Sequence, residues 1–264
     1  DRSLAGATTG AAVLALLSAV AIIPFIAAEM TGSDALALDP GTWHAVLLDT
    51  EFGRVWCWHL GFAAALLAIA AMSRQPWQAG AATLAALLLL ASLGLTGHAA
   101  MDMGGGASHE INQMAHLTAA GLWLGGLVPL GVLLRRAVRP DGDDYVALAR
   151  IALPHFSQIG YVAVALLAIT GTVNSVMLVG SLGAFVTTPY GRLLGVKIGL
   201  FLAMVGLALG NRFRLMPRLR GPQEAIVVPL RTLARSVLAE QAIGLAILAV
   251  VAVLGTWPPA NMAM

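Results

Sequence analysis

The sequence predicts an all-α fold, a polytopic bundle of seven transmembrane helices that forms a single domain over residues 1–264. Three observations predict it. Of the 264 residues 59% are hydrophobic and only 11% are charged, whereas a soluble domain carries about 25% charged residues. Seven apolar runs reach the roughly 20 residues that a helix needs to cross a bilayer. The arginines gather in alternate connections, as in a chain that crosses a membrane repeatedly.

The seven apolar runs follow one another along the whole chain. Backbone polar groups find no water inside lipid, so runs of this length are expected to be helices. The evenly spaced alternating strands of an outer-membrane barrel are absent from the sequence. The predicted spans are Ala7–Ala28, Phe52–Met72, Ala79–Gly97, Asn112–Leu134, Phe156–Val179, Tyr190–Asn211 and Leu233–Trp257.

The basic residues predict the orientation of these spans. Arg2 precedes the first span, and the other basic connections follow the second, fourth and sixth spans, so all of them lie on one side. By the positive-inside rule that side is the cytoplasm, which places the C-terminus in the periplasm. Trp43, Trp56 and Trp257 then fit an outer interfacial belt. The arginines of the three connections are Arg74, Arg135, Arg136, Arg139, Arg150, Arg212, Arg214, Arg218, Arg220, Arg231 and Arg235.

Several classes of protein are excluded or disfavoured by composition. The net charge is only +2, and the arginines form no nucleic-acid surface, so the expected surroundings are a lipid bilayer. Cys57 is the single cysteine, which excludes an intrachain disulfide and a cysteine zinc site. No nucleophile elbow, phosphate loop or zinc-protease motif appears, so we do not expect an enzyme.

Imidazole and thioether side chains concentrate on the predicted outer side. Five of the six histidines and seven of the ten methionines fall in outer loops or in the outer third of a span. Inward positive charge is general in membrane proteins, but outward imidazole and thioether groups are not. This distribution predicts a function at the outer face.

The second span places one histidine well inside the membrane. In "VWCWHLGF" His59 lies about 10 Å below the outer end of the span, at 1.5 Å per residue. Cys57 is two residues away and therefore points to another face, where we expect it to be buried filler and not a ligand.

The loop "GHAAMDMGGGASHE", residues 97–110, holds four possible metal ligands: His98, Met101, Met103 and His109. Thioether sulfur suits Cu(I), imidazole suits copper in either oxidation state, and copper stands at the top of the divalent affinity order. Three glycines let the loop fold back, and a short hairpin would hold His98 near His109. Met262 and Met264, in the terminal "MAM", offer two further sulfurs. The alternative is a glycine-rich turn with incidental methionines and histidines.

The fourth span carries the stripe His109, Gln113 and His116, at spacing i, i+4, i+7. His116 lies about 9–10 Å below the helix start, at the same depth as His59. Polar groups at this depth usually face a bundle interior or a water-filled path. His116 is therefore either a ligand of a buried site or a histidine that packs between helices.

The fifth span has a similar stripe of Thr170, Asn174 and Met177, which is either contact between helices or one wall of an outer vestibule. At its inner end His155 is either a cytoplasmic exit ligand or, as we prefer, a cap of the helix start. In the last two spans Lys197 and Glu240 reach nearly equal depths in a core about 30 Å thick. We expect a structural ion pair between them in preference to a proton relay.

Five motifs, in order, carry a resemblance to a known family: "TGHAA", "AHLTAAGLWLGGLVPL", "TGTVNSVMLVG", "TTPYGRLLGVKIGL" and "GNRFRLMP". Together they resemble the copper resistance protein D family. The resemblance implies a bacterial inner-membrane protein that moves copper from periplasm toward cytoplasm, beside a periplasmic copper-binding carrier of the CopC type. By position it singles out His98, His116 and Asn174. It also implies eight helices, one of them before the first span found in this chain.

Three functions follow from these observations. In the first, His98, Met101, Met103 and His109, with Met262 and Met264, capture copper and pass it to a buried site around His59 and His116. Such transfer needs sites that are weak enough to release the ion. In the second, His59 and His116 are axial ligands of a b-type haem. In the third, the outer site binds or senses copper and nothing crosses the membrane.

Overall fold

The structure, a computed structural model, describes the chain except residues 1, 73–74, 97–105, 140–141, 222 and 261–264. The described residues contain helices and no strand, which confirms the all-α prediction. Six of their helices are long and apolar enough to cross a membrane, and the shorter apolar helix α5 (Gln78–Leu93) matches the third predicted span. Each of the seven predicted spans is therefore helical over most of the residues that the structure describes.

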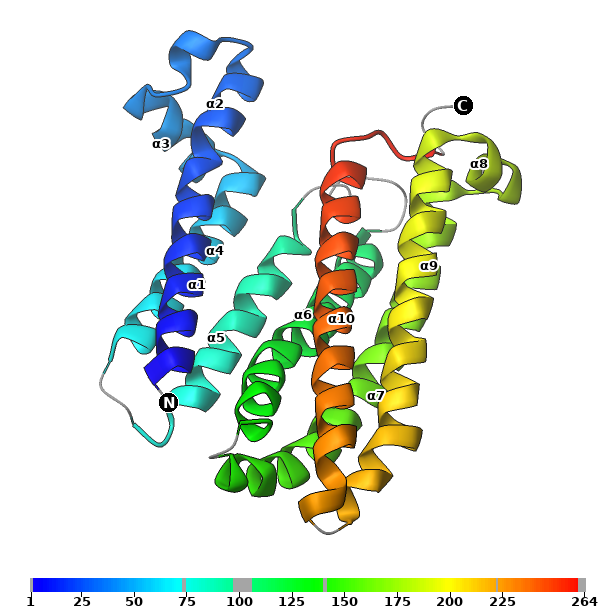
Figure 1. The fold of residues 1–264 in the computed structure, drawn as a ribbon. Helices are drawn as coiled ribbons and strands as arrows, with labels where there is room; N and C mark the ends of the chain where they lie inside the picture. Colours follow the sequence, from blue (N-terminus) through cyan, green and yellow to red (C-terminus); the bar gives the residue numbers. More distant parts are fainter. Residues whose placement is uncertain (1, 73–74, 97–105, 140–141, 222, 261–264) are drawn as a thin grey trace. The chain divides into compact units, whose positions relative to one another are not determined.

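The helices follow one another in the order shown in Figure 1. Two short 3₁₀ turns, η1 (Asp34–Leu36) and η4 (Met216–Arg220), and one π-helical turn, η3 (Asn211–Leu215), interrupt them. The helices are α1 (Arg2–Ala21), α2 (Ile23–Thr31), α3 (Pro40–Asp49), α4 (Glu51–Ala71), α5, α6 (Gly106–Ala137), α7 (Asp143–Val179), α8 (Leu182–Thr187), α9 (Pro189–Gly210) and α10 (Gln223–Leu254).

Two helices begin well before the apolar runs that predicted them. α7 starts at Asp143 and α10 at Gln223, and both continue through an internal proline, Pro154 and Pro229. Apolar length measures only the part of a helix that crosses lipid, so extensions that carry charged or polar residues at the predicted cytoplasmic ends are not detected by it. Proline is tolerated in membrane helices because neighbouring groups satisfy the freed carbonyls.

The chain divides into two compact units, residues 1–118 and 119–264, and the division falls within α6. In the first unit α1, α4 and α5 pack through a core of small and branched residues. Alanines at the contacts let the helix backbones approach closely. The buried members of this core are Ala12, Ala63, Leu66, Ala85 and Leu89.

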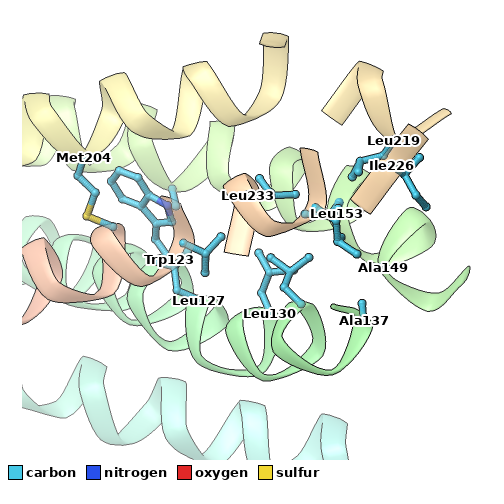
Figure 2. Close-up of a cluster of buried hydrophobic side chains, with 14 of the residues drawn as sticks. Trp123, Leu127, Leu130, Ala137, Ala149, Leu153, Met204, Leu219, Ile226 and Leu233 are labelled. Carbon is cyan, nitrogen blue, oxygen red and sulfur yellow. The ribbon is translucent and has the colours of Figure 1, made fainter. Parts of the chain in front are cut away.

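The second unit has a larger core between α6, α7, α9 and α10 (Figure 2). Trp123 of α6 lies near Met204 at one end of it and meets Phe201 of α9 edge-on, with ring centroids 6.0 Å apart. Leu127 and Leu233 are fully buried beside it. Towards the other end of α9 and α10, Tyr190 and Leu254 belong to a separate buried cluster, so the two helices are in contact along most of their length.

The short helix α3 meets the span α4 at a corner that depends on Thr50. The hydroxyl of Thr50 accepts a hydrogen bond from the backbone N–H of Gly53 at 2.8 Å and donates one to the carbonyl of Val46 at 2.6 Å. A Cβ on Gly53 would overlap the Val46 carbonyl oxygen.

At the start of α3, the N–H and the hydroxyl of Thr42 donate hydrogen bonds to the carboxyl of Asp39 and hold its pKa below its usual range.

The second unit has the same corner between α8 and α9. The hydroxyl of Thr188 accepts from the N–H of Gly191 at 3.0 Å and donates to the carbonyl of Ala184 at 2.6 Å. A Cβ on Gly191 would overlap the carbonyl oxygen of Phe185. The sequences are correspondingly similar, TEFGR over residues 50–54 and TPYGR over residues 188–192. Each unit therefore enters one of its spans through a threonine cap and a glycine that permits close backbone approach.

We predict that Gly53→Ala destabilises the protein by about 1–3 kcal/mol, because the new methyl group forces a backbone carbonyl to move. Gly61→Ala, in the same helix, is the matched control, since nothing lies within 4 Å of a Cβ at that position. Thermal unfolding of the detergent-purified variants, followed by tryptophan fluorescence, measures both. Equal midpoints for Gly53→Ala and the control would contradict this account of the corner.

Candidate functional site

His59 lies in the interior of the first unit, with only 6% of its surface exposed. Its ring stacks on Trp56, one helical turn earlier, with centroids 4.5 Å apart and an interplanar angle of 21°. Trp56 is itself fixed, because its indole N–H donates to the carbonyl of Ala19 at 2.9 Å. The prediction that Trp56 belongs to an interfacial belt is wrong, since this hydrogen bond and its burial place it in the core.

The hydrogen bonds around His59 decide which ring nitrogen carries the proton. Nδ1 of His59 lies 2.8 Å from the hydroxyl oxygen of Ser92 on α5, and that hydroxyl donates to the carbonyl of Leu89 at 2.7 Å. A carbonyl can only accept, so the hydroxyl proton points to Leu89 and Nδ1 must be the donor to Ser92. The neutral ring then keeps a lone pair on Nε2, the state in which histidine ligates a metal.

His109 lies in the first turns of α6 and is 3% exposed. Within the described part of the chain its Nδ1 is buried and has no hydrogen-bond partner. Buried polar atoms nearly always have one, so such an atom calls for an explanation in terms of a ligand or another group.

His116 is half-buried on the same helix and has an interaction partner, as does Gln113. In the residues that the structure describes, no three His, Cys, Asp or Glu side chains lie close enough together to hold one metal ion. The described histidines therefore do not form a three-ligand site by themselves. A buried site shared by His59 and His116 stays a prediction.

The remaining predicted ligands, His98, Met101, Met103, Met262 and Met264, lie outside the described residues. The helices on either side of the predicted loop are in contact, however. A Cβ on Gly94, just after α5, would lie 2.7 Å from the backbone nitrogen and from Cγ of Met114 on α6. The two helices thus approach closely, with a further thioether at their contact.

Two other expectations from the sequence are wrong. Cys57 is exposed, and its thiol donates to the carbonyl of Leu47 at 3.7 Å, because the buried face of α4 runs through Trp56 and His59. His155 does not cap a helix start, because α7 begins twelve residues earlier, at Asp143. Its exposed ring instead bonds the carbonyl of Ile151 through Nδ1 at 2.7 Å. Sequence reasoning also missed Ser92, a lone hydroxyl near the end of an apolar helix.

The predicted ion pair between Lys197 and Glu240 is also wrong. Glu240 is 2% exposed and accepts a hydrogen bond from the side-chain amide of Asn211. No ion pair joins Lys197 to Glu240, both of which the structure describes. Because Leu194 of α9 clusters with Leu254 and Val250 of α10, Lys197 lies level with a position about 10 Å along α10 from Glu240.

The Glu240 carboxyl faces a cavity of about 90 Å³ inside the second unit. Its lining is mainly apolar and includes Trp123 and Val237, with Asn211 and Arg212 as further polar residues. The π-helical turn η3 begins at Asn211 and so alters the course of the backbone where the amide reaches the carboxyl. The second unit thus holds a hydrogen-bonded pair of buried polar side chains beside a mainly apolar cavity.

We predict that Asn211→Leu lowers stability by about 1–3 kcal/mol, because it leaves the buried carboxyl without its donor. Glu240→Met alone leaves the amide unpaired and has a similar effect. The double variant replaces both partners by apolar groups, so its loss is smaller than the sum of the two single losses. Thermal unfolding of the four proteins measures the cycle, and simple additivity would show that the pair is not coupled.

The sequence profile of the family described as "Copper resistance protein D" matches residues 150–254. The profile described as "Copper resistance protein D-like, N-terminal domain" matches residues 1–108. The match to "Inner membrane protein YebZ" of Escherichia coli strain K12 has 32% identity over 252 residues, which cover 94% of this chain and 83% of that relative.

Two further relatives carry copper in their names. "Copper resistance protein D" of Pseudomonas syringae pv. tomato is 36% identical over 226 residues, 82% of this chain and 70% of that protein. "Copper transport protein CutJ" of Bacillus subtilis strain 168 is 31% identical over 236 residues, 84% of this chain but 40% of that protein. No solved structure gives a significant match.

Proposed function

Because this chain belongs to the copper resistance protein D family, a relationship that its motifs already indicated, we propose that it moves copper ions from the periplasm toward the cytoplasm. The chain is a multi-pass protein of the inner membrane, and copper is its substrate in this proposal. We treat residues 1–264 as one copper resistance D-type domain.

The orientation of His59 is the observation that carries the proposal. A histidine that donates Nδ1–H to a fixed acceptor holds its ring in one orientation and offers Nε2 to a metal. The hydrogen bond to Ser92 and the stacking on Trp56 supply that arrangement for His59. Burial excludes water from the ring, so a weak copper site gains from the absence of competing hydration.

The capture step is assigned to the predicted outer side. His98, Met101, Met103 and His109 take the ion, with Met262 and Met264 as further sulfur donors. A periplasmic carrier of the CopC type delivers the copper to them. The unpartnered, buried Nδ1 of His109 supports its part in this step. The ion then passes to His59 and His116, and each site binds weakly enough to release it.

We predict that Ser92→Ala weakens copper binding about 10–100-fold, because His59 loses the acceptor that fixes its tautomer and ring. Ser18→Ala is the matched control, since Ser18 is exposed and its hydroxyl only donates to Ala15 in its own helix. Titration of the detergent-purified variants with Cu(I), against a competing chelator of known affinity, gives the constants. Equal affinities for Cu(I) in Ser92→Ala and the control would show that His59 is not a copper ligand.

Copper uptake into sealed proteoliposomes tests the transport itself. We expect wild-type protein to carry copper into the lumen, and His109→Ala and His116→Ala to slow uptake at least about tenfold. His155→Ala is the control, because its ring is exposed and bonded to its own helix. Copper that binds to the wild-type protein but never reaches the lumen would overturn transport and favour a binding or sensing role. A Soret band in the purified protein would indicate haem at the histidines instead.

A further inference from the structure

Four arginines line one cavity on the predicted cytoplasmic side of the second unit. Arg135 lies in the last turn of α6 and Arg139 just after that helix, whereas Arg231 and Arg235 come from α10. The cavity has a volume of about 530 Å³. Among the residues that the structure describes, no acidic side chain lines it, and its four charged groups are all positive.

The four guanidinium groups are arranged as two pairs. Arg231 and Arg235 are four residues apart on α10 and so lie on one face of it, separated by about 6 Å of rise. Arg135 lies in the last turn of α6, and Arg139 follows two residues after the end of that helix. The two helices close against each other beyond the arginines. There Gln241 donates its side-chain amide to the carbonyl of Leu127 at 2.7 Å.

Neighbouring arginines on the same side serve the protein's own structure, and these four do not. The guanidinium of Arg136 lies over the ring of Tyr145, 5.6 Å from its centroid, and Arg150 donates to the carbonyl of Gly221 at 3.0 Å. The guanidinium groups of the four arginines of the cavity make no hydrogen bond or ion pair with any group that the structure describes. Four like charges around one cavity repel each other unless an anion lies between them.

General rules for membrane helices do not account for this grouping. The positive-inside rule explains the side of the membrane but not convergence on one cavity. The helix dipole stabilises cations near a helix C-terminus, which accounts for Arg135 in the last turn of α6 and Arg139 just after it. Arg231 and Arg235 lie about two and three turns inside α10, where the dipole gives them no such advantage.

We propose that this cavity binds a phosphate-bearing anion, and specifically the headgroup of an anionic phospholipid with two phosphates. Guanidinium groups bind phosphate oxygens in bidentate fashion, and two pairs match two phosphates. Basic cavities between transmembrane helices on the cytoplasmic side suit such headgroups. Val138, Ala234 and Leu238 also line the cavity, so its wall offers apolar contact to the glycerol and acyl parts of a lipid.

Lipid binding to the full chain in detergent, measured by native mass spectrometry, tests this proposal. The probes are cardiolipin, phosphatidylcholine and sodium pyrophosphate, added separately to delipidated protein. We expect cardiolipin to bind, phosphatidylcholine to bind at least about tenfold more weakly, and Arg231→Gln with Arg235→Gln to weaken cardiolipin binding about tenfold or more. The double variant Arg135→Gln with Arg139→Gln has the same effect and replaces the first if that variant does not fold.

Arg214→Gln with Arg218→Gln is the matched control. It removes the same charge on the same side of the membrane from residues that do not line the cavity. Equal losses in control and cavity variants, or equal binding of phosphatidylcholine, would overturn the proposal. Pyrophosphate binding as tight as that of cardiolipin, lost in the cavity variants, would keep the phosphate site and assign it to a soluble anion. None of these outcomes depends on copper transport.

Discussion

A polar side chain inside the bilayer finds no water, and this constraint determines how the interior of the protein is arranged. His59 bonds Ser92, the indole N–H of Trp56 bonds a backbone carbonyl, and Glu240 bonds Asn211. Each of these bonds joins two different helices and therefore fixes their register as well as satisfying the polar group. Apolar packing alone, which lipid tails provide equally well, specifies register much less.

The two units bury different polar groups, although both contain the same short-helix and glycine corner. Both enter a span through a short helix, a threonine cap and a glycine corner, at Thr50 and at Thr188. Below the corner the first unit buries a neutral imidazole, a group suited to a soft or borderline metal. The second unit buries a carboxyl with an amide in an apolar core. In the proposed function the buried copper site around His59 therefore belongs to the first unit, whereas the polar pair of the second unit joins η3 to α10.

The spans were predictable from the sequence because lipid demands long apolar runs, whatever the neighbouring helices do. The burial of His59 and the stripe of His109 and His116 followed from helical spacing in the same way. The hydrogen-bond partners that side chains find on other helices could not be predicted from the spacing within one helix. Depth counted from a helix start led to Glu240 pairing with Lys197, because the start of α10 was placed ten residues too late. Ser92 could have been noticed only as a hydroxyl in an apolar helix, and nothing in the sequence assigns it to His59.

The ends of the helices follow a different rule from their middles, because water and headgroups are present there. On the predicted cytoplasmic side a polar group needs no partner from the protein, so an arginine can remain free at little cost. Arg136 and Arg150 nevertheless bind protein groups, whereas the four arginines of the cavity converge and stay without a partner in the part that the structure describes. Bringing the four guanidinium groups together raises the electrostatic repulsion between them, and an anion supplied by the membrane offsets that repulsion. The same bilayer that forces Glu240 and Asn211 together inside the core thus provides the missing partner at its surface.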